Sequence, residues 1–443
     1  MPGYLRPVAI RRWGFGQQLA VLGVVGLSVR VVYAIYQRRH LPFIFSDATK
    51  YWAMANDLAN GRYFIDPLSG RETADHSPLY SIYLSIAGVA RGGDATQFDL
   101  LLWTCVLGAA SVILIGLAGR EVAGSRVGLI AAAVAAIDPA MWIHDGLLLS
   151  ESMAIFTSVG IIWFAYRLWR SPSLSRVVWL GVWCGLGTLS RSELALSVPL
   201  LLLPLTLRAS GVEWKRKVLW LVAGGVAAGL VLAPWVGYNR SRFEEPVYLT
   251  TNFGRTMAAA KCDGGTAGRF VGAQSYDCLR EIDRAKVKPW MDESQVDDAY
   301  RAEAETYVKE HPGRTFVGIA ASWGRIFGVF RSTQELSYTS TEKIKGITPA
   351  WMATISFYVL FAFSIYGVIL LRRKRVPVYP LLVFWVMILF SVTLTFAQQR
   401  YRAIGEPTLV LLTAVALDQL FRRRTAPAEP DTEAPERVGA GGA

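Results

Sequence analysis

The chain has 443 residues, of which 53% are hydrophobic, and a formal net charge of +12 at neutral pH. Its apolar residues gather in long runs with few charges, such as residues 100–117, 218–234, 351–371 and 376–396. Runs of about 20 such residues match the hydrocarbon thickness of a bilayer, so they exclude a soluble globular protein. The Lys and Arg residues flank these runs in short loops, which is typical of membrane topology and argues against nucleic-acid binding.

The apolar runs predict an all-α polytopic membrane protein with about ten transmembrane helices. We expect these helices near residues 15–36, 98–119, 126–143, 150–168, 176–190, 193–208, 218–236, 349–371, 376–396 and 403–421. Two further apolar stretches, 78–91 and 316–330, are expected to lie on the outer membrane surface, because a crossing at either would invert the charge bias of the later loops. With this count the Arg-rich loops and both termini are cytoplasmic.

The same pattern divides the chain into parts. An N-terminal transmembrane catalytic module is expected over residues 1–236, and it includes a first outer loop at 37–96. A second outer loop region, 237–348, is polar enough to fold over the outer surface, and C-terminal transmembrane helices follow in 349–424. Residues 425–443 are rich in Pro, Ala, Glu and Gly, which predicts a disordered cytoplasmic tail. We therefore expect the protein in the inner or plasma membrane of the cell.

The four cysteines are of two kinds. Cys105 and Cys184 lie inside apolar runs, where cysteine is usually a small buried residue. Cys262 and Cys278 lie in the second outer loop, and they are expected to form a disulfide if that loop faces an oxidising compartment. A bridge that closes about 16 residues contributes roughly 3 kcal/mol to stability. Two free thiols are the alternative.

The first outer loop holds the strongest candidate for chemistry, in the stretch Phe45–Tyr51. Residues from Asp47 onward have helical spacing, and Gly61 is placed to end that helix. Asp47 stands at the start of this interfacial helix, where it can serve simply as an N-terminal cap. Its carboxylate can also act as a general base on an acceptor hydroxyl, with Tyr51 one turn later on the same helix.

Other polar side chains are placed at the outer ends of spans by the same topology. His76 precedes the helix that carries Tyr80, and it is either an ordinary surface histidine or a group that contacts a ligand. Glu151 begins a span, where the helix dipole favours an acid; alternatively it faces an outer cavity and helps to orient an acceptor. His144 and Asp145 are expected to border the same cavity.

Arginines at the outer surface are candidates for binding a phosphate. Arg191 lies in a turn between two short apolar runs, and it is either part of a surface ion pair or a charge drawn into the membrane for function. Arg240 lies where a span meets the second outer loop. Arg400 and Arg402 flank Tyr401 in the last outer loop, against the usual charge bias. They suit recognition of a phosphate at headgroup depth, or contact with lipid headgroups.

Taken in order, these motifs resemble the C-type membrane glycosyltransferases, in the branch related to protein O-mannosyltransferases and the aminoarabinose transferase of lipid A (glycosyltransferase family 39-like). The likeness is carried by Ser46-Asp47-x-x-x-Tyr51, Pro78–Tyr80, Glu151, Leu189-Ser190-Arg191 and Pro234–Arg240. It covers residues 15–255 well and the last three spans loosely. Many relatives carry paired acids in the first loop, whereas here a serine precedes the single base candidate.

The resemblance implies inverting transfer of a hexosyl or pentosyl group from a polyprenyl-phosphate donor to a hydroxyl on a glycan, lipid or protein at the outer face. The residues that it assigns are Asp47 and Glu151 for catalysis, Arg191, Arg240, Arg400 and Arg402 for the donor phosphate, and Tyr51, His76, Tyr80 and Tyr401 around the acceptor cavity. No cofactor is required, since arginines can stabilise the leaving phosphate, and a divalent metal ion is not excluded. A phosphate-cradling glycine loop, which a nucleotide-sugar donor would favour, is not convincing in the sequence.

Two other classes of function stay open. A lipid-linked saccharide flippase or transporter would carry charges deep in its spans and would be built from related halves, and the sequence has few such charges and no evident repeat. A non-catalytic membrane scaffold would tolerate replacement of Asp47.

Overall fold

The computed structural model describes residues 13–38, 47–341 and 347–425. Regular structure in these residues is helical, and the only β pairing among them is an isolated bridge between Ile65 and Glu72. The predicted all-α fold is therefore confirmed. Nearly all of the predicted C-terminal tail lies outside the described residues.

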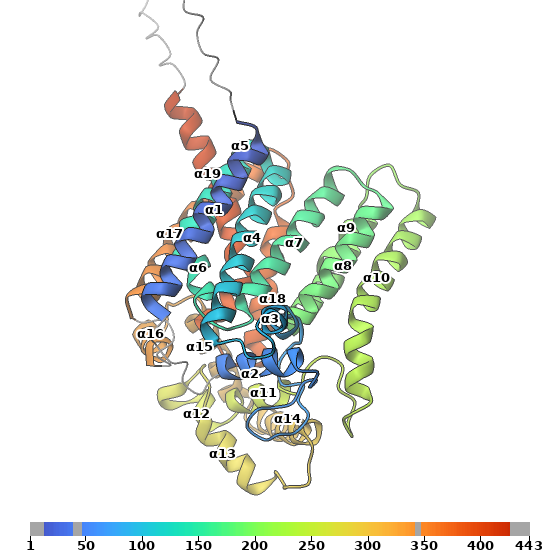
Figure 1. Cartoon of the computed structure of the whole chain (residues 1–443), viewed down its shortest axis with the longest axis vertical. Helices are drawn as coiled ribbons and strands as arrows, with labels where there is room; N and C mark the ends of the chain where they lie inside the picture. Colours follow the sequence, from blue (N-terminus) through green and yellow to red (C-terminus); the bar gives the residue numbers. More distant parts are fainter. Residues whose placement is uncertain (1–12, 39–46, 342–346, 426–443) are drawn as a thin grey trace, which may run out of the picture.

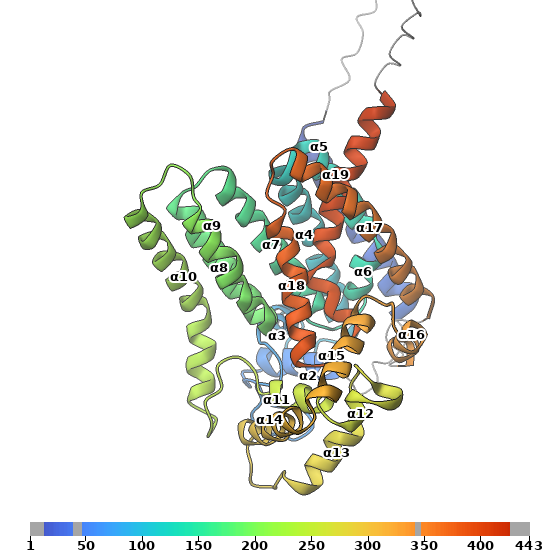
Figure 2. The ribbon, with the colours of Figure 1, turned by 180° about the vertical axis from the view of Figure 1, so that it is seen from behind.

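The long apolar helices run side by side along the long axis of the molecule (Figures 1 and 2). They are α1 (Phe15–Tyr33), α4 (Gln97–Ala123), α5 (Ser125–Ile137), α7 (Glu151–Arg170), α8 (Leu174–Ser190), α10 (Trp214–Arg240), α17 (Ile347–Arg373), α18 (Tyr379–Leu394) and α19 (Glu406–Thr425). Shorter pieces extend or join them: η1 (Ala34–Arg38), α6 (Pro139–Asp145), η2 (Ser192–Leu196), η3 (Val198–Leu202), α9 (Leu203–Leu207) and η5 (Gln399–Ile404).

Every span predicted from the sequence coincides with a helix or a helical series in this set, within a few residues at most ends. Among the described residues, five helices are long and apolar enough to cross a membrane, or six if α5 and α6, bent by 56°, count as one span. The chain is thus a multi-pass membrane protein. The count of ten crossings stays a prediction, because three of the remaining predicted spans, near 176–190, 193–208 and 376–396, form apolar helices of only 10–17 residues.

The two ends of the bundle differ. The start of α1, the end of α19 and the short connections α4–α5, α7–α8, α9–α10 and α17–α18 lie at one end, at the top of Figure 1. Residues 47–96 and 241–341 project from the opposite end, which we call the loop end. The short connections at the top carry most of the Arg-rich segments, and this separation agrees with the predicted charge bias.

Two groups of helices cover the loop end (Figure 1). We name them by their predicted side, the first outer segment (residues 47–96) and the second outer segment (residues 241–341). The first outer segment forms α2 (Asp47–Ala59) and α3 (Leu79–Ala90), and Gly61, with φ of +75°, follows α2 as expected. The second forms α11 (Phe253–Ala260), α12 (Asp263–Thr266), η4 (Gly268–Phe270), α13 (Tyr276–Ala285), α14 (Glu293–Glu310), α15 (Pro312–Ile326) and α16 (Ser332–Thr341). The predicted surface stretches 78–91 and 316–330 fall largely on α3 and α15.

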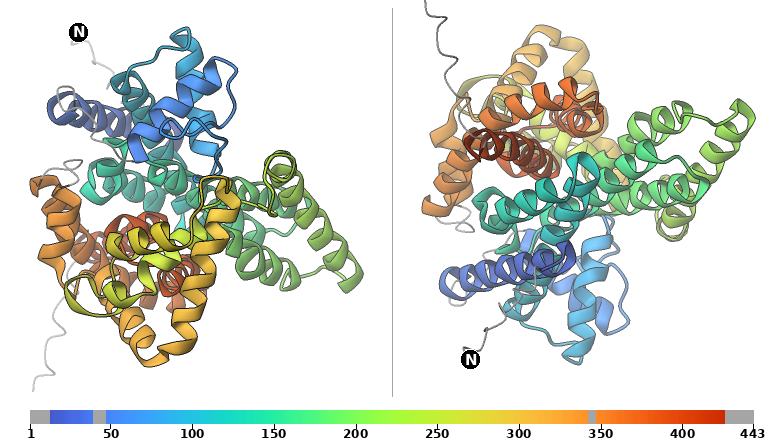
Figure 3. Two further views of the ribbon diagram at one scale, coloured as in Figure 1. Left: turned by 90° about the horizontal axis from the view of Figure 1, so that it is seen from below. Right: turned by 90° about the horizontal axis from the view of Figure 1, so that it is seen from above.

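Helices α8, α9 and α10 extend to one side of the remaining bundle when it is viewed along its axis (Figure 3). Close packing joins α8 to α10, because a Cβ added at Gly181 would lie 2.1 Å from the carbonyl oxygen of Gly224. Small residues at such crossings let helix backbones approach in lipid. The outer face of α10 is exposed at Val222, Val226 and Leu230, as expected for a helix in contact with lipid.

A buried ion pair lies inside the bundle, where the sequence predicted few charges. The Nε of Arg30 on α1 is 2.5 Å from a carboxylate oxygen of Asp145 at the end of α6, and both side chains are almost fully buried. The expectation that Asp145 and His144 border the outer cavity is therefore wrong. Asp145 instead neutralises a cation on α1, and His144 lines a separate cavity of about 20 Å³. A charge inside a bundle needs such a partner.

Candidate functional site

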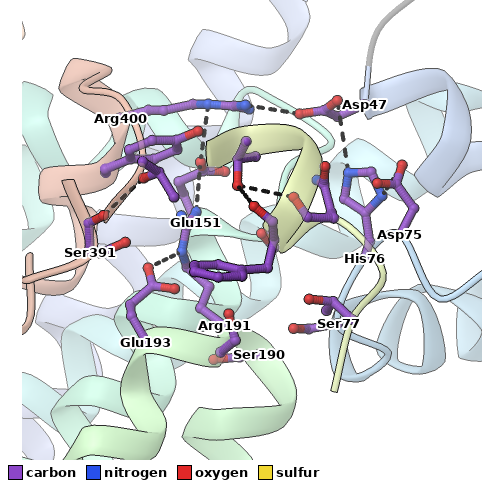
Figure 4. Close-up of a pocket in the computed structure, with 18 of the residues that line it drawn as sticks. Asp47, Asp75, His76, Ser77, Glu151, Ser190, Arg191, Glu193, Ser391 and Arg400 are labelled. Carbon is purple, nitrogen blue, oxygen red and sulfur yellow. Dashed lines mark hydrogen bonds and ion pairs between the residues drawn. The ribbon is translucent and has the colours of Figure 1, made fainter. Parts of the chain in front are cut away.

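A cavity of about 360 Å³ lies where α2 and α11 meet the loop end of the bundle (Figure 4). Its walls come from stretches that are far apart in the sequence. They are the start of α2, residues 75–77, the start of α7, residues 190–196, residues 250–256, the end of α18 and η5. No single stretch forms the cavity, so its shape depends on how the bundle packs.

Asp47 and Arg400 face each other across this cavity (Figure 4). The Nη2 of Arg400 donates a hydrogen bond of 2.9 Å to a carboxylate oxygen of Asp47, whose side chain is 38% exposed. Asp47 is the first residue of α2, so its backbone position also suits the helix dipole. Desolvation raises the pKa of Asp47, but the charges of Arg400 and His76 outweigh it and hold that pKa well below its usual range. The carboxylate is therefore ionised in the cavity.

Glu151 connects two arginines on the floor of the cavity. One of its oxygens accepts a hydrogen bond of 3.2 Å from Arg191 and lies 3.6 Å from the Nε of Arg400. The other oxygen is buried and has no hydrogen-bond partner among the described residues. Arg191 also donates a 2.5 Å hydrogen bond to Glu193. The carboxylates of Glu151 and Glu193 hold both guanidinium groups beside the same cavity.

His76 lies between two carboxylates. Its Nδ1 is 3.2 Å from Asp75 and its Nε2 is 3.8 Å from Asp47. Burial lowers the pKa of His76, but the neighbouring Tyr51, Asp75 and Asp47 outweigh burial and raise that pKa well above its usual value. Lys50 reaches the same Asp75 oxygen at 2.6 Å. His76 is therefore a partly buried member of a charged network, rather than an isolated surface histidine.

Aromatic side chains shape two sides of the cavity. The Tyr51 ring lies edge-on to His76, with centroids 4.9 Å apart, and edge-on to Tyr80 at 5.0 Å. Tyr80 is fully buried and does not line the cavity, because its hydroxyl is hydrogen-bonded to Thr104 behind Tyr51. Tyr401 does line it, and the guanidinium groups of Arg191 and Arg400 lie over its ring at 4.9 and 5.6 Å.

Two of the predicted phosphate ligands are not brought to the cavity. Arg240 is exposed at the end of α10, where its guanidinium lies 5.8 Å from the ring centre of Tyr248. Arg402 is buried behind the cavity, 3.4 Å from Glu406 and 3.9 Å from the ring centre of Phe357. The expectation that these two arginines share the site is wrong, because α10 ends away from the cavity lining and η5 directs Arg402 to the side opposite Arg400. Arg191 and Arg400 do share it.

Several cavity residues had no assigned role in the sequence. Asp75 lines the cavity beside His76, and Lys50, which does not line it, pairs with Asp75. The charges of these two residues next to assigned ones were the available signal in the sequence. Asn252 and Thr256 at α11, and Ser391 at the end of α18, gave no signal, since polar residues at those places are ordinary in loops and helix ends. In the part of the chain that the structure describes, no group of three or more His, Cys, Asp or Glu is placed to hold a metal ion.

The second outer segment closes the cavity from below and contains a disulfide. Cys262 and Cys278 are bonded, with Cα atoms 6.4 Å apart. The bond joins the start of α12 to α13, close to the buried face of α11. Cys105 and Cys184 are buried and unbonded within the bundle.

Comparison with known proteins agrees with this fold. Residues 75–238 match the family model for dolichyl-phosphate-mannose-protein mannosyltransferase. Oligosaccharyltransferase AglB from Archaeoglobus fulgidus, solved with an inhibitory peptide and a dolichol-phosphate, superposes with a TM-score of 0.57 at 15% identity, covering 94% of this chain and 51% of that one. An Archaeoglobus fulgidus oligosaccharyltransferase in complex with Zn and sulfate superposes with a TM-score of 0.55 at 15% identity, covering 92% of this chain and 49% of that one.

ArnT from Cupriavidus metallidurans, bound to undecaprenyl phosphate, is more distant, with a TM-score of 0.43 at 14% identity, covering 92% of this chain and 78% of that one. No curated protein sequence matches the chain. The chain spans about half the length of AglB.

The chain thus has the fold of the C-type membrane glycosyltransferases. Within that class, the matched segment makes it similar to the protein O-mannosyltransferase branch, as the sequence predicted.

Proposed function

We propose that this protein is an inverting glycosyltransferase that moves a sugar from a polyprenyl-phosphate donor to a hydroxyl acceptor at the outer face of the membrane. One observation carries the proposal: Arg400 stands between the carboxylates of Asp47 and Glu151 in a cavity at the loop end of the bundle. An ionised carboxylate and two cations therefore border one cavity, so a base and the ligands of a leaving phosphate can act on opposite faces of one anomeric carbon.

In this proposal the isoprenoid lies among the spans and the donor phosphate lies against Arg400 and Arg191. The acceptor oxygen attacks the anomeric carbon as its proton passes to Asp47. The bond from that carbon to the phosphate oxygen breaks, and the electron pair leaves with the polyprenyl phosphate. Negative charge grows on the phosphate during this step, so two fixed guanidinium groups stabilise the transition state more than the ground state.

The other cavity residues support these two roles. Glu151 contacts both arginines and is almost fully buried, so we assign it to positioning the cations rather than to proton transfer. His76 and Asp75 hold one side of Asp47 and keep its carboxylate directed into the cavity. Tyr401 separates Arg191 from Arg400 and fixes the distance between them.

The test is a transfer assay on the full chain in nanodiscs, with a panel of radiolabelled polyprenyl-phosphate pentoses and hexoses and membranes of the source cell as acceptor. We expect at least one donor to release labelled product, and Asp47→Asn to lose that activity. Asp57→Asn is the matched control. It lies on the same helix, pairs with Arg62 and does not line the cavity. Equal rates in wild type and Asp47→Asn would contradict the base assignment.

A further inference from the structure

A second cavity, of about 620 Å³, lies between the two outer segments. Its walls come from residues 50–75 on one side and residues 242–300 on the other. In Figure 1, α14 lies below α2 and α11 at the loop end, away from the bundle. The volume is in the range of pockets that bury a small ligand. The catalytic proposal does not use this cavity.

The walls of this second cavity are fixed by hydrogen bonds between the two segments. Glu293 on α14 accepts hydrogen bonds from the Thr73 hydroxyl at 2.8 Å, the Ala74 amide at 2.7 Å and the Thr251 hydroxyl at 2.6 Å. Arg71 donates to the carbonyl oxygens of Pro289 and Met291 at 2.9 and 3.2 Å. Such cross-links hold a pocket in shape before a ligand binds, which lowers the entropic cost of binding.

The second cavity adjoins the catalytic one. Asp75 lines both, and residues 250–256 contribute Asn252 and Thr256 to one and Thr251 and Arg255 to the other. From Asp75 the path to the proposed base is short, since His76 lies 3.2 Å from Asp75 and 3.8 Å from Asp47. The two cavities therefore meet at Asp75, and a ligand in the second cavity would lie next to the catalytic one.

The lining contains both kinds of hydrogen-bonding group. Six carboxyl side chains and four cationic side chains line it. The Nε of Arg242 is buried with no hydrogen-bond partner among the described residues, and Asp297 is about nine-tenths buried. The guanidinium of Arg255 is exposed and makes no ion pair within the described ranges.

Carboxylates accept hydrogen bonds and guanidinium groups donate them, whereas a hydroxyl does both. A ligand rich in hydroxyl groups satisfies this mixture, and Ile65, Leu68 and Phe243 offer apolar surface beside it. The excess of carboxyl groups opposes an anionic ligand.

We propose that this cavity is the acceptor subsite and that it binds a neutral, hydroxyl-rich glycan, one hydroxyl of which reaches Asp47. This inference rests on the proposed glycosyl transfer, and it assigns the acceptor class that the catalytic cavity alone leaves open.

The test measures binding and not only turnover. Full-length protein in nanodiscs is titrated with a panel of neutral oligosaccharides, and binding is followed by saturation-transfer NMR. Undecaprenyl phosphate binding is measured on the same preparations. Leu68→Trp fills the cavity from a side chain that is 55% exposed, so the fold is not disturbed. Arg255→Ala removes the exposed cation.

We expect an oligosaccharide to bind wild type, to bind Leu68→Trp at least about tenfold more weakly and to bind Arg255→Ala several-fold more weakly. Val329→Trp and Arg280→Ala are the matched controls, because both residues are exposed and neither lines the cavity. Undecaprenyl phosphate binding is expected to be equal in all five proteins.

Two results would overturn the subsite. They are no oligosaccharide binding to wild type, or equal oligosaccharide binding in Leu68→Trp and wild type. If wild type does not bind undecaprenyl phosphate, the proposed donor is wrong. Glycan binding that is present in wild type and weakened in Leu68→Trp would still support the subsite. The two proposals can therefore fail separately.

Discussion

Arg400 donates a 2.9 Å hydrogen bond to Asp47 across 353 residues of sequence. The cation that we assign to the donor phosphate is thus also the partner of the proposed base. When a donor binds, the two roles compete, because Arg400 cannot neutralise a phosphate and hold the pKa of Asp47 low to the same degree. A bound phosphate would draw Arg400 toward itself and leave Asp47 more basic.

The first prediction follows from this competition. Asp47→Asn should lower transfer by about 10²–10⁴-fold, the usual cost of losing a general base. The same variant should bind undecaprenyl phosphate more tightly than wild type, because Arg400 no longer contacts an anion there. Equilibrium binding and single-turnover transfer measure the two effects, with Asp57→Asn as control. Weaker phosphate binding would indicate that Asp47 organises the site.

The second prediction is that loss of an arginine that lines the cavity weakens donor binding, whereas loss of an arginine outside it does not. Arg400→Ala and Arg191→Ala are each expected to weaken undecaprenyl phosphate binding by about 10–100-fold, since a charge-assisted hydrogen bond contributes roughly 1.5–3 kcal/mol. Arg240→Ala should bind like wild type, because Arg240 is exposed and distant from the cavity lining. Titration of each variant in nanodiscs with undecaprenyl phosphate measures its affinity. Equal losses of undecaprenyl phosphate affinity in Arg240→Ala and Arg400→Ala would show that the phosphate does not bind in this cavity.

The third prediction concerns pH. His76 stands 3.8 Å from Asp47, and its charge, with that of Arg400, holds the pKa of Asp47 below the usual range. A carboxylate that loses a nearby cation binds its proton more tightly. His76→Gln should therefore shift the acid limb of kcat/KM for the donor to higher pH, and the rate at a fixed low pH should fall. An unchanged acid limb would show that His76 does not act on Asp47.

The disulfide gives a prediction about stability. Because Cys262 and Cys278 are 16 residues apart, reduction should lower the free energy of unfolding of the second outer segment by about 3 kcal/mol. Without reductant, alkylation of the native protein should label neither of these cysteines, and Cys105 and Cys184 should react only after denaturation because they are buried. Mass spectrometry of the alkylated peptides distinguishes the bonded cysteines from the two buried free thiols. Ready alkylation of Cys262 and Cys278 would contradict the bond in the cell.

Topology can be tested with matched tryptophans at the two ends of the bundle. Trp290 lies in the second outer segment and Trp214 starts α10 at the opposite end, and both side chains are exposed. In intact cells, Trp290→Cys should react with a membrane-impermeant maleimide and Trp214→Cys should not. Reaction of Trp214→Cys alone would place the catalytic cavity on the cytoplasmic side.

The sequence determined the helices of this protein and the class to which its fold belongs. Apolar runs such as 351–371 need no tertiary partner to become helical in lipid, since a membrane leaves the backbone no other way to satisfy its hydrogen bonds. Gly61 could be assigned to the end of α2 for a different local reason, since glycine readily adopts the positive φ that ends a helix. Asp47, Glu151 and Arg400 could be assigned to the loop end because alternation of the spans fixes which end each connection occupies.

The tertiary structure decided which of those side chains meet. Arg400 and Arg402 are indistinguishable by composition and position, but η5 turns one toward Asp47 and buries the other beside Glu406. Asp145 looked like a cavity residue and instead pairs with Arg30, because α6 directs it inward. The second cavity joins residues near 70 to residues near 290, a pairing that no local pattern reports. Contacts of this range depend on how whole helices pack, so a reading of local sequence could not provide them.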